Sequence, residues 1–302
     1  MFMEKTLSII IPVYNEEGAL PLVLPDVMDF VIRNGYHLIM VNDGSKDRSL
    51  QVLEQFTNHY DHYKIVSHKL NKGYGGAIKS GILAAETDYV ITIDADGQHY
   101  LEDVNHLFHY LKETDADMIV GSRKGLKEAS VFRGVGKYII RWVAKKMMPL
   151  NIYDINSGMK IYNSSLAKTY IKLCPNSMAY SDIIGLVFIS QRHLVLEHPI
   201  NIKPRVEGKS TIGVRTAFDT LMEILNVVIL FKPMRIFLPL SLVFVFLGMV
   251  WALQFLIINR GLSIGASMLI SVGVLFFAIG LISEQLSQIR KSSVLKDGDA
   301  GY

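Results

Sequence analysis

Two aspartates and a glutamine follow an apolar run in the first half of the chain. The run covers residues 89–93, and residues 94–99 after it have the sequence Asp-Ala-Asp-Gly-Gln-His. The β-branched and aromatic residues of the run favour a buried parallel strand, and α/β sheets bind ligands at the carboxyl ends of such strands. Oxygen ligands at this place favour Mg²⁺ or Mn²⁺, ions that usually keep waters and bridge a diphosphate. These residues therefore predict a metal site with a nucleotide diphosphate as its first candidate ligand; a solvated turn or a helix cap is the alternative.

Two further predicted strands also end in polar residues. Residues 7–13 form an apolar run followed by Tyr-Asn-Glu at 14–16, and residues 37–41 lead into Asn-Asp-Gly-Ser at 42–45. Because parallel strands share their carboxyl edge, we expect these polar groups on one edge of a sheet. Residues 71–77, Asn-Lys-Gly-Tyr-Gly-Gly-Ala, open a helix whose small residues allow close packing. This glycine run is neither a Walker loop nor the full dinucleotide fingerprint.

Five segments, in this order and spacing, resemble the family 2 glycosyltransferases. Within that family, the chain most resembles the dolichyl-phosphate mannose synthases and the bacterial polyprenyl-phosphate glycosyltransferases. The segments are residues 12–16, 42–45, 71–77, 94–99 and 121–123. The resemblance covers residues 6 to about 211. It implies an α/β fold of the GT-A (Rossmann-like) type, a UDP- or GDP-linked sugar as donor, Mg²⁺ or Mn²⁺, and inversion at the anomeric carbon. It also implies an acceptor that is a polyprenyl phosphate, either undecaprenyl or dolichyl phosphate.

The resemblance assigns roles around the donor. Asp96 and Gln98 would hold the metal, with Asp96 as a catalytic residue, and Asp94 and Ala95 would line the donor site. The residues that would contact the donor's nucleoside are Pro12, Tyr14, Glu16 and Asp43, the last near the base or ribose. The structural alternatives are that Pro12 ends a strand, that Tyr14 packs, and that Glu16 and Asp43 cap helices. His99 is expected to support the metal ligands rather than to be one.

The resemblance also assigns roles around the acceptor. Arg123 would be a catalytic residue that faces the reacting phosphates. Further candidates for the acceptor phosphate are Arg133, Arg205, Lys209 and Ser210. The last three lie in a segment that resembles a loop closing over donor and acceptor. Related enzymes usually carry Lys directly after that Ser, whereas this chain has Thr211, so the loop's charge would come from Arg205 and Lys209.

A lipid phosphate is already an anionic nucleophile at neutral pH, so the transfer needs positioned charges more than a strong base. Asp182 lies where some relatives carry a catalytic carboxylate, and a phosphate acceptor removes the need for it. Residues 154–160 resemble a family segment that turns the chain beneath the active site. Asp154 could act there or only cap the turn.

Composition excludes several other classes of protein. The 302 residues allow one catalytic domain of roughly 200 residues plus a tail. A net charge of +3 gives no case for nucleic acid, and Cys174, the single cysteine, excludes an internal disulfide. The nine histidines have no metal-ligand spacing on a helix, and the chain has no Gly-x-Ser-x-Gly elbow. A zinc site and a hydrolase therefore have no support.

Two uncharged runs predict a membrane hairpin. Residues 236–258 and 262–283 contain no formal charge over 23 and 22 positions, and a membrane-spanning helix needs roughly 20. Lys and Arg flank the pair, which by the positive-inside rule places both termini in the cytoplasm. Without a signal peptide before the first strand, the catalytic domain should be cytosolic.

We expect an integral protein of a bacterial-type inner or plasma membrane. Its parts would be a catalytic domain (1–211), an amphipathic juxtamembrane helix (212–235), two spans (236–283) and a cytosolic tail (284–302).

Three stretches have helical patterns related to a membrane. Residues 135–148 interleave basic and apolar side chains, which predicts a helix on the membrane surface or an ordinary helix with a solvated basic face. Residues 217–231 predict an interfacial helix. Ser263, Ser267 and Ser271 recur every four residues. This stripe predicts close packing of the hairpin or of a homo-oligomer, with a lipid-facing helix as the alternative.

Three functional hypotheses follow. The first is a polyprenyl-phosphate glycosyltransferase that makes a lipid-linked monosaccharide on the cytosolic leaflet. The second is a processive polysaccharide synthase, against which residues 191–195 lack the Gln-x-x-Arg-Trp acceptor motif and two spans are few for a polymer channel. The third is a catalytically inactive membrane scaffold, against which stand the intact Asp94, Asp96, Gln98 and Arg123.

Overall fold

The computed structural model describes residues 5–57, 59–123, 152–203, 222, 229, 232–257, 261 and 263–299. The chain divides into two compact units. The first comprises Met1–Ile139 and Met148–Thr220, and the second comprises Ile140–Met147 and Leu221–Tyr302.

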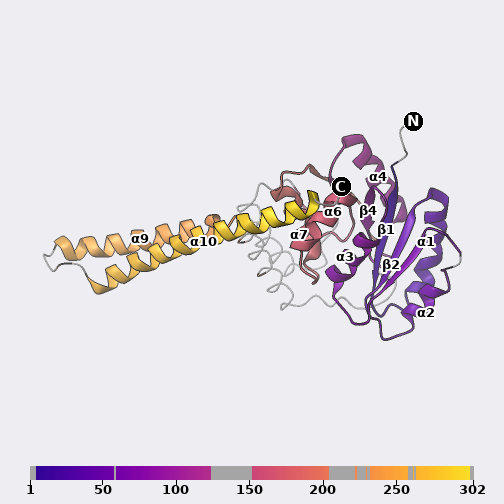
Figure 1. Ribbon diagram of the computed structural model, residues 1–302, viewed down its shortest axis with the longest axis horizontal. Helices are drawn as coiled ribbons and strands as arrows, with labels where there is room; N and C mark the ends of the chain where they lie inside the picture. Colours follow the sequence, from indigo (N-terminus) through magenta and orange to yellow (C-terminus); the bar gives the residue numbers. More distant parts are fainter. Residues whose placement is uncertain are drawn as a thin grey trace. The chain divides into compact units, whose positions relative to one another are not determined.

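A seven-stranded sheet forms the centre of the first unit (Figure 1), in the order β3-β2-β1-β4-β6-β5-β7. The strands are β1 Leu7–Val13, β2 His37–Asn42, β3 Tyr63–Ser67, β4 Tyr89–Thr92, β5 Met118–Ser122, β6 Lys160–Asn163 and β7 Val195–Pro199. Strands β3, β2, β1 and β4 are parallel, and so are β5 and β7. Strand β6 runs antiparallel between β4 and β5. The predicted α/β class is confirmed.

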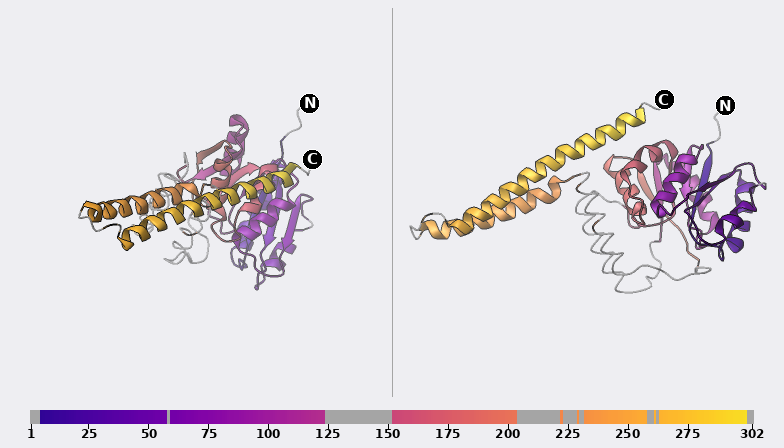
Figure 2. Two further views of the ribbon diagram at one scale, coloured as in Figure 1. Left: turned by 60° about the vertical axis from the view of Figure 1, so that its left-hand side comes forward. Right: turned by 60° about the horizontal axis from the view of Figure 1, so that its bottom comes forward.

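Helices cover both faces of this sheet, as the views in Figures 1 and 2 show. The helices are α1 Leu20–Asn34, α2 Ser49–Glu54, α3 Tyr74–Ala84, α4 Leu101–Thr114, α6 Ser164–Tyr170 and α7 Tyr180–Ser190, with a 3₁₀ turn at Ile171–Leu173. The apolar stripes of α1 and α4 join a core with Ile9 and Ile11 of β1. Since neighbouring residues of a strand point to opposite faces, Ile10 faces the other side, where Gly81 of α3 lies against it.

The register places the carboxyl ends of β1, β2 and β4 at one edge. Val13 pairs with Asn42, and Ile10 pairs with Thr92. The segments that begin at Tyr14, Asp43 and Ile93 therefore leave the sheet on the same side, as the polar strand ends predict. Because β6 is antiparallel, its first residue also starts at this edge.

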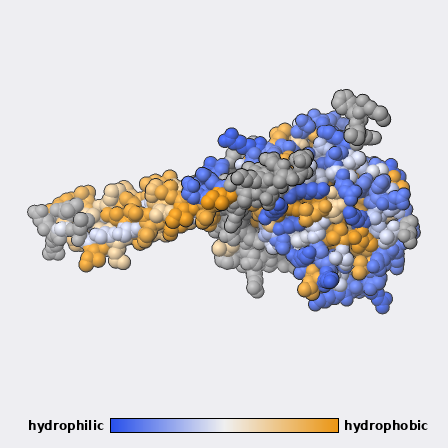
Figure 3. Space-filling view, in the orientation of Figure 1, coloured by the Kyte–Doolittle hydropathy of each residue, from blue (hydrophilic) through white to orange (hydrophobic). Residues whose placement is uncertain are grey.

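The second unit contains two long helices, α9 Met234–Ile257 and α10 Ile264–Asp299. Within them, Met234–Phe255 and Ile264–Ile289 are long and apolar enough to cross a membrane. Most large apolar side chains of both helices are exposed, which Figure 3 shows as a hydrophobic surface along the pair. Such a surface suits lipid as its surroundings.

Small residues line the seam between α9 and α10. Ala266, Gly273 and Gly280 recur every seven residues and are buried. A Cβ at Gly273 would lie 2.6 Å from Cγ2 of Val245 and 2.9 Å from the carbonyl oxygen of Ser241. Small residues thus allow the two backbones to approach closely.

The serine stripe does not form this seam. Ser267 and Ser271 are exposed on α10 and Ser263 is half-buried. The prediction that these serines pack the hairpin is therefore wrong, because the small buried residues follow a seven-residue period instead. Packing of the serines in a homo-oligomer stays a prediction.

Gly81→Ala should destabilise the sheet layer, since the added Cβ would overlap Cγ2 of Ile10 and lie 3.2 Å from Cγ2 of Val41. We expect a loss of about 1–3 kcal/mol, measured as a lower thermal unfolding midpoint in detergent. Gly185→Ala is the matched control, because a Cβ at this helical glycine meets nothing within 4 Å. It should gain about 0.4–1 kcal/mol. Equal midpoints for the two variants would contradict the close packing of α3 on β1.

Gly273→Leu should open the hairpin, because the added side chain would meet backbone atoms of α9 that have no room to shift. We expect a loss of at least about 1–3 kcal/mol and a lower yield of monodisperse protein in detergent. Ser271→Leu, two residues away on the exposed face of the same helix, should leave both measurements unchanged. A tolerated Gly273→Leu would contradict the seam.

Candidate active site

The carboxylate of Asp94 is fixed by groups from three segments. The hydroxyl of Tyr74, at the start of α3, donates to Oδ1 over 3.0 Å, and Nε2 of His99 lies 3.6 Å from Oδ2. Gly158 lies directly against it, because a Cβ there would be 2.6 Å from Oδ2. Burial raises the pKa of Asp94, but the bonds and charges of His99, Tyr74 and Arg123 outweigh burial and hold the pKa below its ordinary value. Asp94 is therefore ionised at neutral pH.

Asp96 and Gln98 lie in the turn that follows. Asp96 is buried, and its Oδ1 accepts the backbone N–H of Gln98 over 3.1 Å. The side-chain nitrogen of Gln98 donates to the carbonyl oxygen of Lys203 over 3.4 Å, and the N–H of Lys203 donates to the carbonyl oxygen of Gln98 over 2.8 Å. With its nitrogen directed at Lys203, the amide of Gln98 presents its oxygen as the atom that could bind a cation.

These residues fit a metal ion only in part. Across the described ranges, no three His, Cys, Asp or Glu side chains are grouped so that they could hold an ion. Asp96 and Gln98 supply one carboxylate and one amide, a set that suits an ion taking its other ligands from phosphates and water. The ring of His99 is buried, and its Nδ1 has no hydrogen-bond partner among the described residues. Its Nε2 faces Asp94.

Arg123 and Asp154 form a bidentate ion pair in which Asp154 is buried and Arg123 is half-buried. Nε of Arg123 donates to Oδ2 over 2.6 Å and Nη2 donates to Oδ1 over 2.8 Å, while Nη2 also donates to Asn156. Oε1 of Glu197, on β7, accepts the backbone N–H groups of Tyr153 and Asp154. Burial raises the pKa of Asp154, but Arg123 more than compensates and lowers it below its ordinary value. The pair fixes the guanidinium at the end of β5.

Asp43 holds the glycine run in place. Its buried carboxylate accepts the backbone N–H groups of Lys72 and Gly73 over 2.8 and 2.9 Å, and Nδ1 of His68 lies 2.6 Å from Oδ1. The other ring nitrogen of His68 contacts the hydroxyl of Ser80 at 2.8 Å. Asp43 therefore joins the ends of β2 and β3 to the start of α3.

The remaining predicted residues around the donor have varied surroundings. Pro12 lies within β1 opposite Val41, Tyr14 is exposed beyond the strand, and Glu16 is half-buried. Ala95 is buried and belongs to the apolar core. The cap of α1 is Ala19, so Glu16 is not that helix's N-cap.

The profile of the family described as Glycosyl transferase family 2 matches residues 8–170, more than half of the chain. The chain belongs to glycosyltransferase family 2. A second profile, described as the GtrB C-terminal hairpin, matches residues 232–289 of this glycosyltransferase. Strands β2 to β6, all of β1 except Leu7, and the residues from Asp43 to Asp154 lie within the first match.

Curated relatives and a solved structure resemble this family 2 enzyme. An undecaprenyl-phosphate 4-deoxy-4-formamido-L-arabinose transferase of Photorhabdus laumondii is 26% identical over 299 residues, 94% of this chain and 90% of that protein. A dolichyl-phosphate beta-glucosyltransferase of Dictyostelium discoideum is 28% identical over 180 residues, 54% of this chain and 55% of that one. The glucosyl-3-phosphoglycerate synthase of Mycobacterium tuberculosis, solved with Mn²⁺, UDP-glucose and phosphoglyceric acid, has a TM-score of 0.58 at 15% identity, covering 74% of this chain and 80% of that one. The predicted GT-A fold is confirmed.

Several features of the glycosyltransferase's site do not follow from its motifs. The partners Tyr74, His68 and Lys160 carry no predicted role, although Tyr74 and Lys160 stand within the quoted segments 71–77 and 154–160. The Arg123–Asp154 pair joins residues 31 positions apart. Arg133, Arg205, Lys209, Ser210 and Thr211 lie outside the residues that the structure describes, as do residues 135–148 and most of 217–231.

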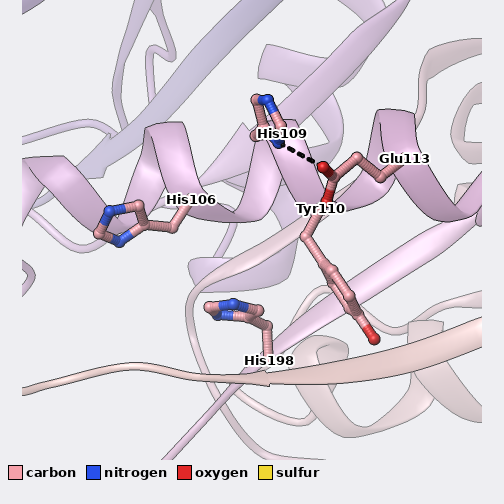
Figure 4. Close-up of a pocket in the computed structure, with 5 residues that line it drawn as sticks. All are labelled: His106, His109, Tyr110, Glu113 and His198. Carbon is pink, nitrogen blue, oxygen red and sulfur yellow. Dashed lines mark ion pairs between the residues drawn. The ribbon is translucent and has the colours of Figure 1, made fainter.

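A histidine-lined hollow elsewhere in the enzyme is separate from this site (Figure 4). It has a volume of about 350 Å³ and is lined by His106, His109, Tyr110 and Glu113 of α4 and by His198 of β7. His109 pairs with Glu113 at 3.3 Å, and the ring centroids of His106 and His198 are 6.5 Å apart. None of the residues that hold Asp94 or Arg123 lines it, so we assign it no part in the reaction.

Asp154→Asn should lower the free energy of unfolding at pH 7 by about 1.5–3 kcal/mol, because Arg123 would lose its ionic hydrogen bonds. The folded pKa of Asp154 is depressed, so its stabilisation is complete above the ordinary value of about 3.9 and is lost as pH falls through the folded pKa. The difference between wild type and variant should be constant from about pH 5 to 8 and shrink below about pH 4. Thermal unfolding across this range measures it.

Asp61→Asn, at an exposed carboxylate before β3, is the matched control and should change the midpoint little at any pH. A wild-type advantage over Asp154→Asn that is as large at pH 3 as at pH 7 would contradict the ion pair.

Proposed function

We propose that this enzyme transfers a sugar from a nucleoside-diphosphate sugar to a polyprenyl phosphate. The observation that best supports a polyprenyl phosphate as acceptor is the match to the Photorhabdus transferase. This match spans 94% of the chain and so includes both the catalytic domain and the hairpin. The Dictyostelium relative is also named for a polyprenyl phosphate, dolichyl phosphate. A membrane hairpin fits this proposal, because a polyprenyl acceptor is held in a bilayer.

For the metal, we propose Mg²⁺ or Mn²⁺ between Asp96, Gln98 and the donor's diphosphate. The bound ion would offset the charge that develops on the leaving diphosphate. The orientation of the Gln98 amide by Lys203 supports this assignment, and so does the Mn²⁺ with UDP-glucose in the structurally similar synthase.

For the donor, we propose that its nucleoside lies over the ends of β1 and β2. Tyr14 is exposed there, and Oδ2 of Asp43, which accepts the N–H of Gly73, can accept a second hydrogen bond from the base or ribose. Pro12 and Glu16 flank Tyr14, and Asp94 and Ala95 would lie beside the diphosphate and sugar. Uridine and guanosine both suit this arrangement.

The transfer is a single displacement with inversion. An oxygen of the lipid phosphate forms a bond to the anomeric carbon, and the bond from that carbon to the diphosphate oxygen breaks. The departing nucleoside diphosphate keeps the electron pair, and no proton has to be removed from the phosphate nucleophile. Asp182 is therefore not needed as a base.

Arg123 would face the reacting phosphates. The acceptor phosphate would be held by Arg133, Arg205, Lys209 and Ser210, where bidentate arginines offset the repulsion between two anions.

For the orientation, we propose that the catalytic domain and both termini are cytoplasmic, so that the product forms on the cytosolic leaflet. The excess of Lys and Arg on the outer flanks of the two apolar helices supports this orientation.

Asp96→Ala should reduce transfer about 10²–10³-fold, the usual cost of removing one preorganised group that stabilises developing charge. The assay combines detergent-purified protein, Mg²⁺ or Mn²⁺, undecaprenyl or dolichyl phosphate and a panel of UDP- and GDP-sugars. Mass spectrometry follows the lipid-linked sugar, and EDTA should abolish it until metal is restored. Asp61→Ala, at the opposite edge of the sheet, should retain wild-type activity.

The products distinguish the alternatives. One sugar per lipid supports the proposal, whereas a ladder of sugars would indicate a processive synthase. No transfer and no donor hydrolysis by folded protein with any donor would indicate the scaffold.

A further inference from the structure

Lys160 lies buried beneath the proposed donor site, and the reaction described above gives it no role. Only 2% of the residue is exposed, and it begins β6 opposite Thr92 of β4 and Val120 of β5. Its ammonium donates to the carbonyl oxygen of Ser157. Lysine is almost never fully buried unless its charge is paired, so this ammonium requires negative charge nearby.

The turn that Lys160 bonds lies directly under Asp94. Ser157 and Gly158 form this turn, and Gly158 packs so closely that a Cβ would be 2.6 Å from Oδ2 of Asp94. The carbonyl oxygen of Gly158 accepts the hydroxyl of Thr92 over 2.7 Å, which ties the turn to the end of β4. Tyr74 and His99 also contact this carboxylate, so the turn is one of three described groups that lie against it.

Charged groups from four segments act on the ammonium of Lys160. The ionised groups that act on it are Asp182 from α7, Asp154 before β6, Arg123 after β5 and Asp94 after β4. Arg123 is engaged by Asp154 in the bidentate pair. Asp94 and the buried Asp182 add further negative charge near the ammonium of Lys160.

We propose that Lys160 is a positioning residue of the transfer reaction, holding the Ser157–Gly158 turn against Asp94 through the bond from its charged ammonium to the carbonyl oxygen of Ser157. This inference rests on the proposed function and adds a residue to that same site. Lys160 itself touches neither donor nor acceptor in this role. It acts through Asp94.

The role predicts a dependence on pH. Burial lowers the pKa of Lys160 to about 8, against the attraction of Asp182, Asp154 and Asp94. The charged form is present below this value and is lost as pH rises through it. The neighbouring hydroxyls of Tyr74 and Tyr180 have pKa values raised well above 10, so they stay protonated over this range. The wild-type enzyme should therefore lose kcat/KM with an apparent pKa near 8.

The test measures kcat/KM of detergent-purified full-length protein from pH 6 to 10, for wild type, Lys160→Met and Lys160→Arg. Lys160→Met should lose about 10- to 100-fold at pH 7 and become insensitive to pH between 7 and 9, since misplacing a site group by about 1 Å can cost 10²-fold. Lys160→Arg keeps the charge at every pH, so its decline should move above pH 9. Lys168→Met is the matched control, because Lys168 likewise donates its ammonium to a backbone carbonyl, that of Ala85, away from the site.

The outcomes separate this inference from the proposed function. If wild type makes product with a rate that is flat from pH 7 to 9.5, or if Lys160→Met keeps the wild-type profile, the role of Lys160 is overturned while the transfer stands. If wild type makes no product under any condition, the proposed function itself fails. If Lys160→Met does not fold, the wild-type profile and Lys160→Arg still test the role of Lys160. The measurement is then the pH at which kcat/KM of Lys160→Arg declines, because an altered stability alone does not move an apparent pKa.

Discussion

The active site depends on one antiparallel strand placed between parallel ones. Strands β4 and β5 end at the same edge of the sheet, and β6, which runs the other way between them, begins there. The residues after β4, those after β5 and those before β6 must therefore meet. This is why Asp94, Arg123 and the segment from Asp154 to Lys160 lie together. If β6 were parallel, its first residue would start at the opposite edge, and Arg123 would lose its bidentate partner Asp154.

When several ionised side chains lie this close together, each one needs a partner of opposite charge or a hydrogen bond. Arg123 and Asp154 bind each other through two hydrogen bonds, and the carboxylate of Glu197 fixes the backbone on which Asp154 sits. Because the carboxylate of this pair is buried, breaking the pair costs more than forming it gains, and its value to the enzyme is a fixed geometry rather than stability. For the two anionic substrates that we propose, such a site benefits from charges that need no rearrangement when the substrates arrive.

The sequence predicted the fold and the polar strand ends because local patterns encode both. Apolar runs closed by Asp, Asn or Gly fix where β1, β2 and β4 end, and parallel pairing then brings those ends together. The position of β6 was not predictable, because four residues of mixed character, Lys-Ile-Tyr-Asn, carry no signal for the strands beside them. The Arg123–Asp154 pair follows from that position and stayed hidden with it. In the hairpin, the four-residue spacing of the polar serines predicted the contact between the helices. The contact instead depends on small side-chain volume, and Gly273 and Gly280 form it.

The described part of the site fits the proposed donor better than the proposed acceptor. It contains more carboxylates than cations, an arrangement suited to a metal-bound diphosphate and poorly suited to a second phosphate. The cations predicted for the acceptor, Arg133, Arg205 and Lys209, belong to two segments that leave the described fold at the site itself. One follows Arg123 at the end of β5, and the other follows Lys203, which is bonded to Gln98. Both attachment points lie at the described site, because Lys203 is bonded to Gln98 and the charge of Arg123 acts on Asp94. In the proposed reaction, the acceptor phosphate needs positive charge beyond that of Arg123, which Asp154 already binds through two hydrogen bonds.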